Sequence, residues 1–306
     1  MALKDLIPLG LSLPHRSPDP IAPGTVRAVA QRAEALGFRD LWVTENTLDH
    51  VFSFDPIGVL TFAAAATRTI RLGCSVVVLP VHDPRLLAHQ WATLDQLSEG
   101  RAILGVGIGR PEHFRSFEVP IEGRVGRMRE QLALIRSLWT QDRTTLHGRF
   151  HQVTDVTMPL KPVQHPYLPI WMGVGHPDAV RRSATLADGW MGAGGSTTAD
   201  FARSLPVLRE ALEKAGRDPA AYPVSKRVFM AVDEREDAAR AALLRWYDQV
   251  YFNAGGTETS GVYGTPAQVS EKLAALVEMG ANHLVLNPVA NHAEQIEAVA
   301  EMAGLR

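Results

Sequence analysis

The sequence predicts an α/β protein folded as a (β/α)8 barrel. Short runs rich in β-forming residues alternate with longer runs of helical periodicity along all 306 residues. An open doubly wound sheet, the main alternative, requires a Gly-x-Gly-x-x-Gly turn after its first strand, but this strand ends in Ser12-Leu13-Pro14-His15. The later Gly105/Gly107/Gly109 run has Glu112 where the third glycine belongs. Both observations favour the closed barrel.

The expected strands are short and rich in β-branched, aromatic or other apolar residues. Their ranges are Leu6–Leu13, Asp40–Thr44, Ile70–Leu79, Ala102–Val106, Ile170–Met172, Gly189–Met191, Val224–Val232 and His283–Leu286.

The expected helices carry recognisable start and stop signals. Asp55-Pro56 and Asp83-Pro84 each place an N-cap aspartate before a first-turn proline, so helices begin at residues 56 and 84. The other expected helices are Val26–Leu36, Val125–Leu138, Pro177–Ala187, Ala199–Ala215, Arg235–Tyr251, Pro266–Met279 and Ala293–Ala303. The segment Thr140–Pro169 contains four prolines and no long periodic helix, and is interpreted as an excursion within a single domain spanning residues 1–306.

Composition excludes several classes of protein. Lys plus Arg number 31 and Asp plus Glu 33, which gives a net charge of −2 and argues against a broad nucleic-acid surface or a polybasic membrane patch. Hydrophobic residues make up 46%, too many for a disordered chain. The first residues lack the pattern of a signal peptide, and apolar runs such as Phe62–Ala66 are far shorter than a membrane span. We expect a cytoplasmic protein.

Metal binding and nucleophilic catalysis are weakly indicated. The single cysteine, Cys74, allows no internal disulfide and no cysteine-based zinc cluster, and its place within an apolar strand is typical of a buried, inert thiol. The histidines are not spaced as in a His-Glu-x-x-His metal site, and no Gly-x-Ser-x-Gly elbow occurs. No metal is therefore expected.

Two glycine-rich turns stand where a barrel places its active site, at the carboxyl ends of the strands. Gly173-Val174-Gly175-His176 and Gly192-Ala193-Gly194-Gly195 each lead directly into an expected helix. Backbone N–H groups at such a turn can cradle a phosphate, although glycine also simply relieves strain in tight turns. Two such turns on adjacent strands favour a phosphate-bearing ligand.

Several stretches, in order along the chain, resemble the bacterial luciferase-like superfamily of flavin- and deazaflavin-dependent oxidoreductases. They are Arg32–Phe38 with Leu41–Glu45, Ala64–Gly73, Leu94–Arg101 running into Leu104–Gly107, Pro169–Gly173 with Ala187–Trp190, and Gly264–Pro266. The resemblance implies a (β/α)8 barrel that binds FMN or the 5-deazaflavin coenzyme F420 in its mouth.

The resemblance also implies where the cofactor lies. It places Cys74-Ser75-Val76 against the ring, with a non-prolyl cis peptide bond at Ser75–Val76, and the phosphate on the two glycine-rich turns. The cofactor-binding residues that follow are Cys74, Ser75, Val76, Gly107, Gly173, Val174, Gly175, His176, Gly192, Ala193 and Gly194.

The catalytic candidates include two departures from the family pattern. Where relatives carry Asp-His or Glu-His after the second strand, this chain has Glu45-Asn46, so either Asn46 replaces the histidine or His50 supplies it from further along the loop. Where F420-dependent sugar-phosphate dehydrogenases have a glutamate after the fourth strand, this chain has Arg110, with Glu112 two residues later. His50, Glu45, Asn46 and Glu112 are the catalytic candidates, and His50, Glu45 and Glu112 are those that can donate or accept a proton.

Three functions follow from the resemblance. The preferred one is hydride transfer between F420 and a small organic substrate, because the chain lacks the long insertion of many FMN-using relatives and because Ser75-Val76 is similar to the F420 branch. The first alternative is an FMN-dependent monooxygenase using oxygen, and the second is a flavin- or F420-binding protein without catalysis. A homodimer is expected, through the helix that carries Arg85, Leu86, Leu87, His89, Trp91 and Leu94.

Overall fold

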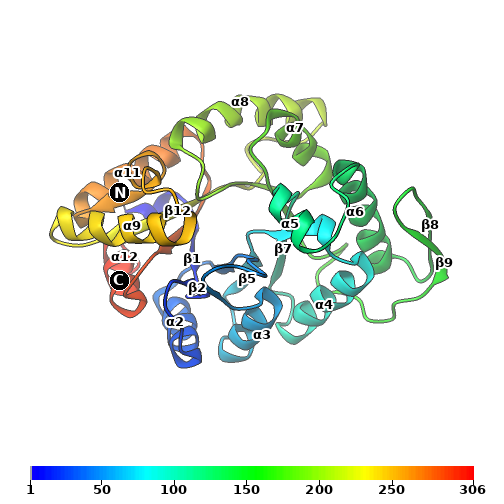
Figure 1. The fold of residues 1–306 in the computed structure, drawn as a ribbon, viewed down its shortest axis with the longest axis horizontal. Coiled ribbons are helices and arrows are strands. Elements are labelled where there is room, and N and C mark those ends of the chain that lie inside the picture. Colours follow the sequence, from blue (N-terminus) through cyan, green and yellow to red (C-terminus); the bar gives the residue numbers. More distant parts are fainter. Residues whose placement is uncertain (1) are drawn as a thin grey trace.

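The computed structural model, which describes residues 2–306, contains a closed ring of parallel strands (Figure 1). Its members in ring order are β1 (Leu9–Ser12), β3 (Asp40–Val43), β5 (Arg71–Cys74), β7 (Ala102–Gly107), β10 (Ile170–Gly173), β11 (Gly189–Gly192), β12 (Val224–Val232) and β14 (His283–Pro288). Strand β14 pairs back with β1, with Leu9 opposite Leu284, and β7 pairs with β10. The predicted (β/α)8 barrel is confirmed.

Helices between successive strands surround the ring. The longer ones are α2 (Pro23–Leu36), α3 (Pro56–Ala66), α4 (Pro84–Leu97), α6 (Arg124–Thr140), α7 (Pro177–Leu186), α8 (Thr198–Lys214), α9 (Glu236–Tyr251), α11 (Pro266–Met279) and α12 (His292–Ala303). The predicted starts of α3 and α4 are confirmed, since Asp55 accepts from the Gly58 N–H and Asp83 from the Arg85 N–H, each at 2.8 Å.

Shorter elements complete the fold. They are α1 (Leu3–Leu6), β2 (Arg16–Ser17), β4 (Phe52–Ser53), β6 (Val77–Val78), the 3₁₀ turn η1 (Leu79–Val81), α5 (Pro111–Ser116), β8 (Thr144–His147), β9 (Gln152–Val156), α10 (Gly256–Thr259) and β13 (Val262–Gly264). No helix among residues 2–306 is long and apolar enough to cross a membrane.

Two predicted strands differ from the structure. The first begins at Leu9, because Leu6 belongs to the short helix α1. The range Ile70–Leu79 is divided into β5 and β6, because the chain leaves the barrel ladder at Ser75 and Val76 before pairing with β7 again. This interruption lies at the carboxyl end of β5, on the side of the barrel where an active site is expected.

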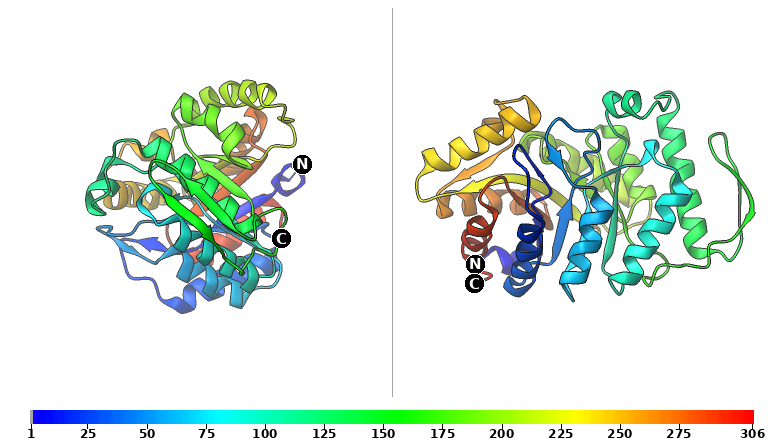
Figure 2. Two further views of the ribbon diagram at one scale, coloured as in Figure 1. Left: turned by 90° about the vertical axis from the view of Figure 1, so that its right-hand side faces the viewer. Right: turned by 60° about the horizontal axis from the view of Figure 1, so that its bottom comes forward.

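The predicted excursion at residues 140–169 contains an antiparallel hairpin, β8–β9, that extends beyond α6 (Figures 1 and 2). Glu130 of α6 holds the hairpin turn, since its carboxylate accepts from the N–H groups of Arg149, Phe150 and His151 at 2.8–3.2 Å. The alternation of strands and helices resumes after the excursion, as the sequence predicts.

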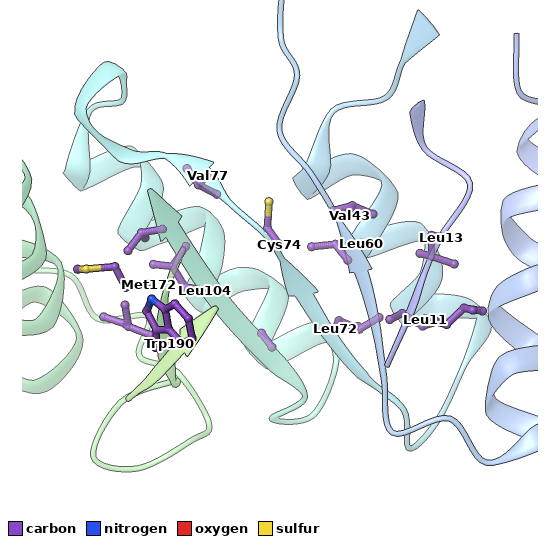
Figure 3. Close-up of a cluster of buried hydrophobic side chains, with 14 of the residues drawn as sticks. Leu11, Leu13, Val43, Leu60, Leu72, Cys74, Val77, Leu104, Met172 and Trp190 are labelled. Atoms are coloured by element: carbon purple, nitrogen blue, oxygen red, sulfur yellow. The ribbon is translucent and has the colours of Figure 1, made fainter. Parts of the chain in front are cut away.

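Apolar side chains fill two separate spaces. Between the strands and the outer helices, Leu11, Val43, Leu72, Leu104 and Met172 pack with Leu60 and Trp190 (Figure 3). Inside the ring, the fully buried cluster comprises Trp42, Ile103, Trp171, Met191 and Val285, with the rings of Trp42 and Trp171 at 5.3 Å between centroids. This cluster fills the lower part of the lumen with buried side chains.

A paired set of ionisable groups lies at the base of the lumen, the amino-terminal end of the strands. The Asp40 carboxylate lies 3.1 Å from the His283 Nε2 and accepts a hydrogen bond from the Trp42 indole. Ser225 Oγ lies 2.8 Å from the other ring nitrogen of His283. Although burial alone would raise the pKa of Asp40, His283 and Trp42 hold this pKa below its ordinary value.

Arg101 and Asp95 form a set of hydrogen bonds, here called the Arg101 staple, that joins two turns beneath the barrel. The Arg101 guanidinium donates to the carbonyls of Ser98, Ala64 and Ile70 at 2.6–3.0 Å. Asp95 accepts from the N–H of Val163 at 2.7 Å. These contacts hold the α3–β5 and α4–β7 turns in place.

Candidate active site

Four polar residues meet inside the upper lumen, three from the strands β1, β12 and β14 and one, Ser75, from the segment after β5. The Arg227 Nε donates to Asn287 Oδ1 at 3.0 Å, and its two terminal nitrogens donate to the Ser75 carbonyl at 3.3 Å and to Ser12 Oγ at 3.4 Å. Because side chains alternate along each strand, these residues point into the ring above the tryptophan layer. They form the floor of the barrel mouth.

Arg227 is a buried cation without an anionic partner. Its side chain is 5% exposed, and its hydrogen-bond acceptors within residues 2–306 are an amide, a carbonyl and hydroxyls. Burial lowers the pKa of Arg227 to about 10, which leaves it charged at neutral pH. Buried charges are ordinarily paired, because leaving water is costly for an ion. The unpaired charge therefore suggests a place for a ligand that carries or acquires negative charge.

The neighbouring His15 is buried beside this floor and adds no charge to it. Its Nδ1 lies 2.7 Å from the Leu13 carbonyl, and its Nε2 accepts from the Thr44 N–H at 2.8 Å. Burial, with a further contribution from Arg227, lowers the pKa of His15 to about 3. The ring is thus neutral at physiological pH and joins the loops after β1 and β3.

The segment Cys74-Ser75-Val76 lies at the edge of this floor. The Ser75–Val76 peptide bond is cis, as the resemblance implies. Cys74 turns its thiol away from the lumen into the outer core (Figure 3), where burial raises the pKa of the thiol well above its ordinary value. Only its backbone can face a ligand. Ser75 is half-buried and accepts from Arg227 through its carbonyl.

Two predicted cofactor glycines make room for Val76. A Cβ atom at Gly107 or at Gly173 would lie 2.5 Å from a methyl group of Val76. The absence of a side chain at these positions is therefore explained by packing on the bulge after β5. The residues still help to fix the position of Val76 at the mouth.

The two glycine-rich turns retain unused donors. No hydrogen bond within residues 2–306 engages the N–H groups of Gly175, His176, Gly194 or Gly195, and a Cβ at Gly175 or Gly195 would meet no atom within 4 Å. Val174 instead accepts from the Trp190 indole through its carbonyl, at 2.9 Å. Open N–H groups of this kind fit a phosphate.

The helices behind these turns contribute less than the sequence indicates. At the start of α7 the His176 ring accepts from the Asp178 N–H at 3.3 Å, and at the start of α8 Thr197 Oγ1 accepts from the Asp200 N–H at 3.0 Å. Both helices also carry an aspartate in the first turn, whose charge opposes an anion. The loop N–H groups are consequently the better phosphate donors.

Glu45, a candidate for proton transfer, is buried and doubly engaged. One carboxylate oxygen accepts from the Val78 N–H at 2.6 Å, and the other lies 2.6 Å from Nε2 of the half-buried His82. The carboxylate thereby joins the loop after β3 to the segment after β5. A proton can reach Glu45 through His82.

Asn46 and His50 occupy different surroundings. Asn46 is half-buried and donates to Thr44 Oγ1 at 2.5 Å. His50 is exposed, lies 2.9 Å from the Gln249 carbonyl, and stacks on Phe252 at 4.4 Å between ring centroids. The loop thus brings His50 against the end of α9, while Asn46 stays with the network of His15.

Glu112 lies on the rim. It is exposed on α5, 3.7 Å from Arg115. Burial and Arg110 lower the pKa of the adjacent His113, against a raising effect from the carboxylates of Glu45 and Glu112. The rim and the Glu45 loop therefore lie within electrostatic range of one another.

The sequence of this chain matches a known protein family over most of its length. The family model described as luciferase-like monooxygenase matches residues 7–261. The chain belongs to this family. Among its relatives is the F420-dependent glucose-6-phosphate dehydrogenase of Kineococcus radiotolerans, 30% identical over 234 residues, which are 74% of this chain and 68% of that protein.

Solved structures share the fold of this luciferase-like chain. An F420-dependent secondary alcohol dehydrogenase in complex with an F420-acetone adduct superposes with a TM-score of 0.85 at 19% identity, covering 98% of both chains. The oxygenating constituent of 3,6-diketocamphane monooxygenase from Pseudomonas putida, in complex with FMN, gives a TM-score of 0.77 at 17% identity, again over 98% of both chains. The luciferase-like fold thus occurs with either cofactor.

Sequence reasoning missed the two basic residues of β12, Lys226 and Arg227. They were included in the expected strand Val224–Val232 without a role. The available signal was their adjacency, because a strand of a closed barrel has one face toward the lumen and the other toward the helices. Two successive cations on such a strand must both be buried, and the structure buries both.

Proposed function

We propose that this chain is an oxidoreductase that transfers a hydride between coenzyme F420 and a small organic substrate at the carboxyl end of the barrel. Arg227 is the observation that carries the proposal. A ring that accepts a hydride gains negative charge, and a fixed cation beside it favours that change without reorganisation. Relatives that are F420-dependent glucose-6-phosphate dehydrogenases support the choice of cofactor.

The residues at the mouth fit a planar ring with a phosphate tail. Ser75 and Val76 would face the ring, and the free N–H groups of Gly175, His176, Gly194 and Gly195 would hold the phosphate. When bound, F420 supplies the hydride acceptor or donor. The tryptophan layer below the floor blocks water from that side, and Arg227 holds its positive charge next to the Ser75 carbonyl.

Proton transfer is assigned to the carboxylates and polar groups around the mouth. Glu45 with His82 is the pair best placed to hold a proton away from bulk water, since their atoms lie 2.6 Å apart and Glu45 is buried. His50 and Glu112 stay candidates for proton transfer closer to solvent, and Asn46 stays a candidate for the place of the family histidine. Arg110 occupies the place of a family glutamate, so we propose no sugar phosphate as substrate.

Titration followed by absorbance and fluorescence, with F420 and with FMN in parallel, tests the cofactor. We expect F420 to bind with a dissociation constant at least about tenfold lower than that of FMN, a difference of about 1.4 kcal/mol. Tight binding of FMN without binding of F420 would contradict the proposal. It would favour the first alternative, an FMN-dependent monooxygenase.

A non-catalytic binding protein is the remaining alternative. It would bind F420 yet fail to reduce or oxidise it with any alcohol, aldehyde or unsaturated substrate offered.

The substrate is proposed to be a small molecule rather than nucleic acid or membrane, since the net charge of the chain is −2. The proposed location is the cytoplasm.

A homodimer through α4 is also proposed. Leu86 and Leu97 on this helix are 66% and 61% exposed, and His89 is exposed as well. By contrast, Leu87, Trp91 and Leu94 pack into the core of their own chain and are unavailable to a partner. A monomer mass in light scattering at micromolar concentration would contradict the dimer.

A further inference from the structure

The second buried cation of β12, Lys226, lies beneath one of the two glycine-rich turns. It immediately precedes Arg227, so it points to the opposite side of the strand, away from the lumen. Its side chain is 2% exposed and passes Gly192, where a Cβ would lie 3.2 Å from the Lys226 Cδ. The ammonium group ends inside the loop that joins β11 to α8.

Three acceptors from this loop surround the ammonium group. Nζ donates to the Ser196 carbonyl and to Ser196 Oγ, each at 2.8 Å, and also to the Ala193 carbonyl. The three N–H bonds of the ammonium are therefore all used. No carboxylate within residues 2–306 accepts from it, since Asp200 instead binds Thr197 and Arg203. Burial lowers the pKa of Lys226 to about 7.

The loop turns its carbonyls toward the ammonium group and leaves other donors free. Ala193 and Ser196 direct their carbonyl groups at Lys226, and the N–H groups of the intervening Gly194 and Gly195 meet no acceptor in residues 2–306. Gly195 also faces open space at its Cβ position. A loop wrapped around a cation, with free donors, is complementary to an anion in shape and in charge.

We propose that Lys226 is a positioning residue that gives the 193–196 loop its conformation and its positive charge, and thereby sets the affinity of this site for the phosphate of the ribityl chain. The inference rests on the proposed function, because it concerns the same cofactor site. The phosphate is shared by F420 and FMN, so the inference holds whichever of the two is the cofactor.

Pairs of ligands that differ in the phosphate test the proposal. Lys226→Met is titrated by fluorescence with F420 and with the phosphate-free 5-deazaflavin that ends at the ribityl chain, and in parallel with FMN and riboflavin. We expect the dissociation constants of F420 and FMN to rise about ten- to hundredfold, as for loss of a charged hydrogen-bonding group. Those of the two phosphate-free ligands should change less than about threefold.

Lys214→Met is the matched control. Lys214 lies at the end of α8, is 74% exposed and pairs with Glu210 at 2.5 Å, so its replacement makes the same change of side chain without touching the loop. It should bind all four ligands like the wild type. Near-ultraviolet circular dichroism and binding of the phosphate-free ligands show that Lys226→Met remains folded.

The outcomes separate the inference from the proposed function. Equal weakening of all four ligands would mean that Lys226 only supports the fold, and unchanged binding would mean that it does not act on the loop; either result overturns the inference while the proposed function stands. If the wild-type protein binds neither F420 nor FMN, the proposed function and the inference both fail.

Discussion

The two ends of the barrel bury ionisable groups in opposite ways. At the base, the Asp40 carboxylate meets His283 and Trp42, so its charge is compensated within the chain. At the mouth, Arg227 meets only neutral acceptors, and its charge is left for something outside the chain. Both sets are equally inaccessible to water. We propose that the base serves the fold, whereas the mouth gives up some stability in order to bind a ligand.

The largest effect is expected from Asp40→Ala. The substitution leaves the Trp42 indole and the His283 ring without their acceptor in a dry lumen, so the free energy of unfolding should fall by about 3–5 kcal/mol. Urea denaturation followed by tryptophan fluorescence measures this. Asp155→Ala, which removes an exposed carboxylate paired with Arg143 on the hairpin, is the control and should cost less than about 1 kcal/mol. Similar losses for both variants would contradict the proposed role of the base.

Arg227→Met should give the reverse pattern. Removing an uncompensated buried charge is expected to change the free energy of unfolding by no more than about 1 kcal/mol, because lost hydrogen bonds and relieved desolvation oppose each other. The dissociation constant of F420 should nevertheless rise about ten- to hundredfold. Arg245→Met, which removes a 59% exposed arginine paired with Asp19, should alter neither quantity. If Arg227→Met unfolds the protein and leaves affinity intact, the two ends of the barrel do not differ as stated.

A smaller effect concerns the pH dependence of stability at the mouth. The pKa of His15 is about 3 in the folded chain and about 6.5 when unfolded, so between these values only the unfolded chain takes up the proton. Stability should therefore fall as the pH falls, by about 1 kcal/mol per pH unit from this group between pH 5.5 and 4.5.

The variant His15→Gln isolates that contribution. Its unfolding free energy, measured in urea at several pH values, should decline less steeply with falling pH than that of the wild type. The remaining slope includes His292, whose pKa burial lowers to about 4. Parallel slopes in the two proteins would show that His15 is not held neutral at the mouth.

Much of the fold followed from periodicity, and the reason is physical. Strands such as Asp40–Val43 and Val224–Val232 are bounded by turn residues, and the helices at Pro56 and Pro84 have caps that operate through adjacent atoms. Local chemistry of this kind is visible in the sequence. The hairpin β8–β9 was not foreseen, because its turn is held by Glu130 of the preceding helix α6, a contact across 19 and 20 residues that periodicity does not show.

The site was harder to predict for the same reason. The glycine-rich turns were visible in the sequence. The requirement for glycine at 107 and 173, where a side chain would collide with Val76, appears only when strands distant in sequence lie side by side. The engagement of Glu45 by Val78 and His82 is likewise a contact between loops. Sequence periodicity places a residue on a strand, whereas its charge partners are decided by neighbouring strands.

The Arg101 staple has a consequence for assigning a function to one family member from its sequence similarity to another. The segment from Leu94 to Arg101 is one of the stretches that resemble the family, and its polar residues fasten turns under the barrel, at the end remote from the mouth. Two chains can share this segment fully and still act on different molecules. A sequence similarity that rests mainly on such positions shows that two chains share the barrel fold by descent, and does not show that they share a substrate. Discriminating the chemistry of one member from another requires weighting the few positions around Ser12, Glu45, Ser75 and Arg227.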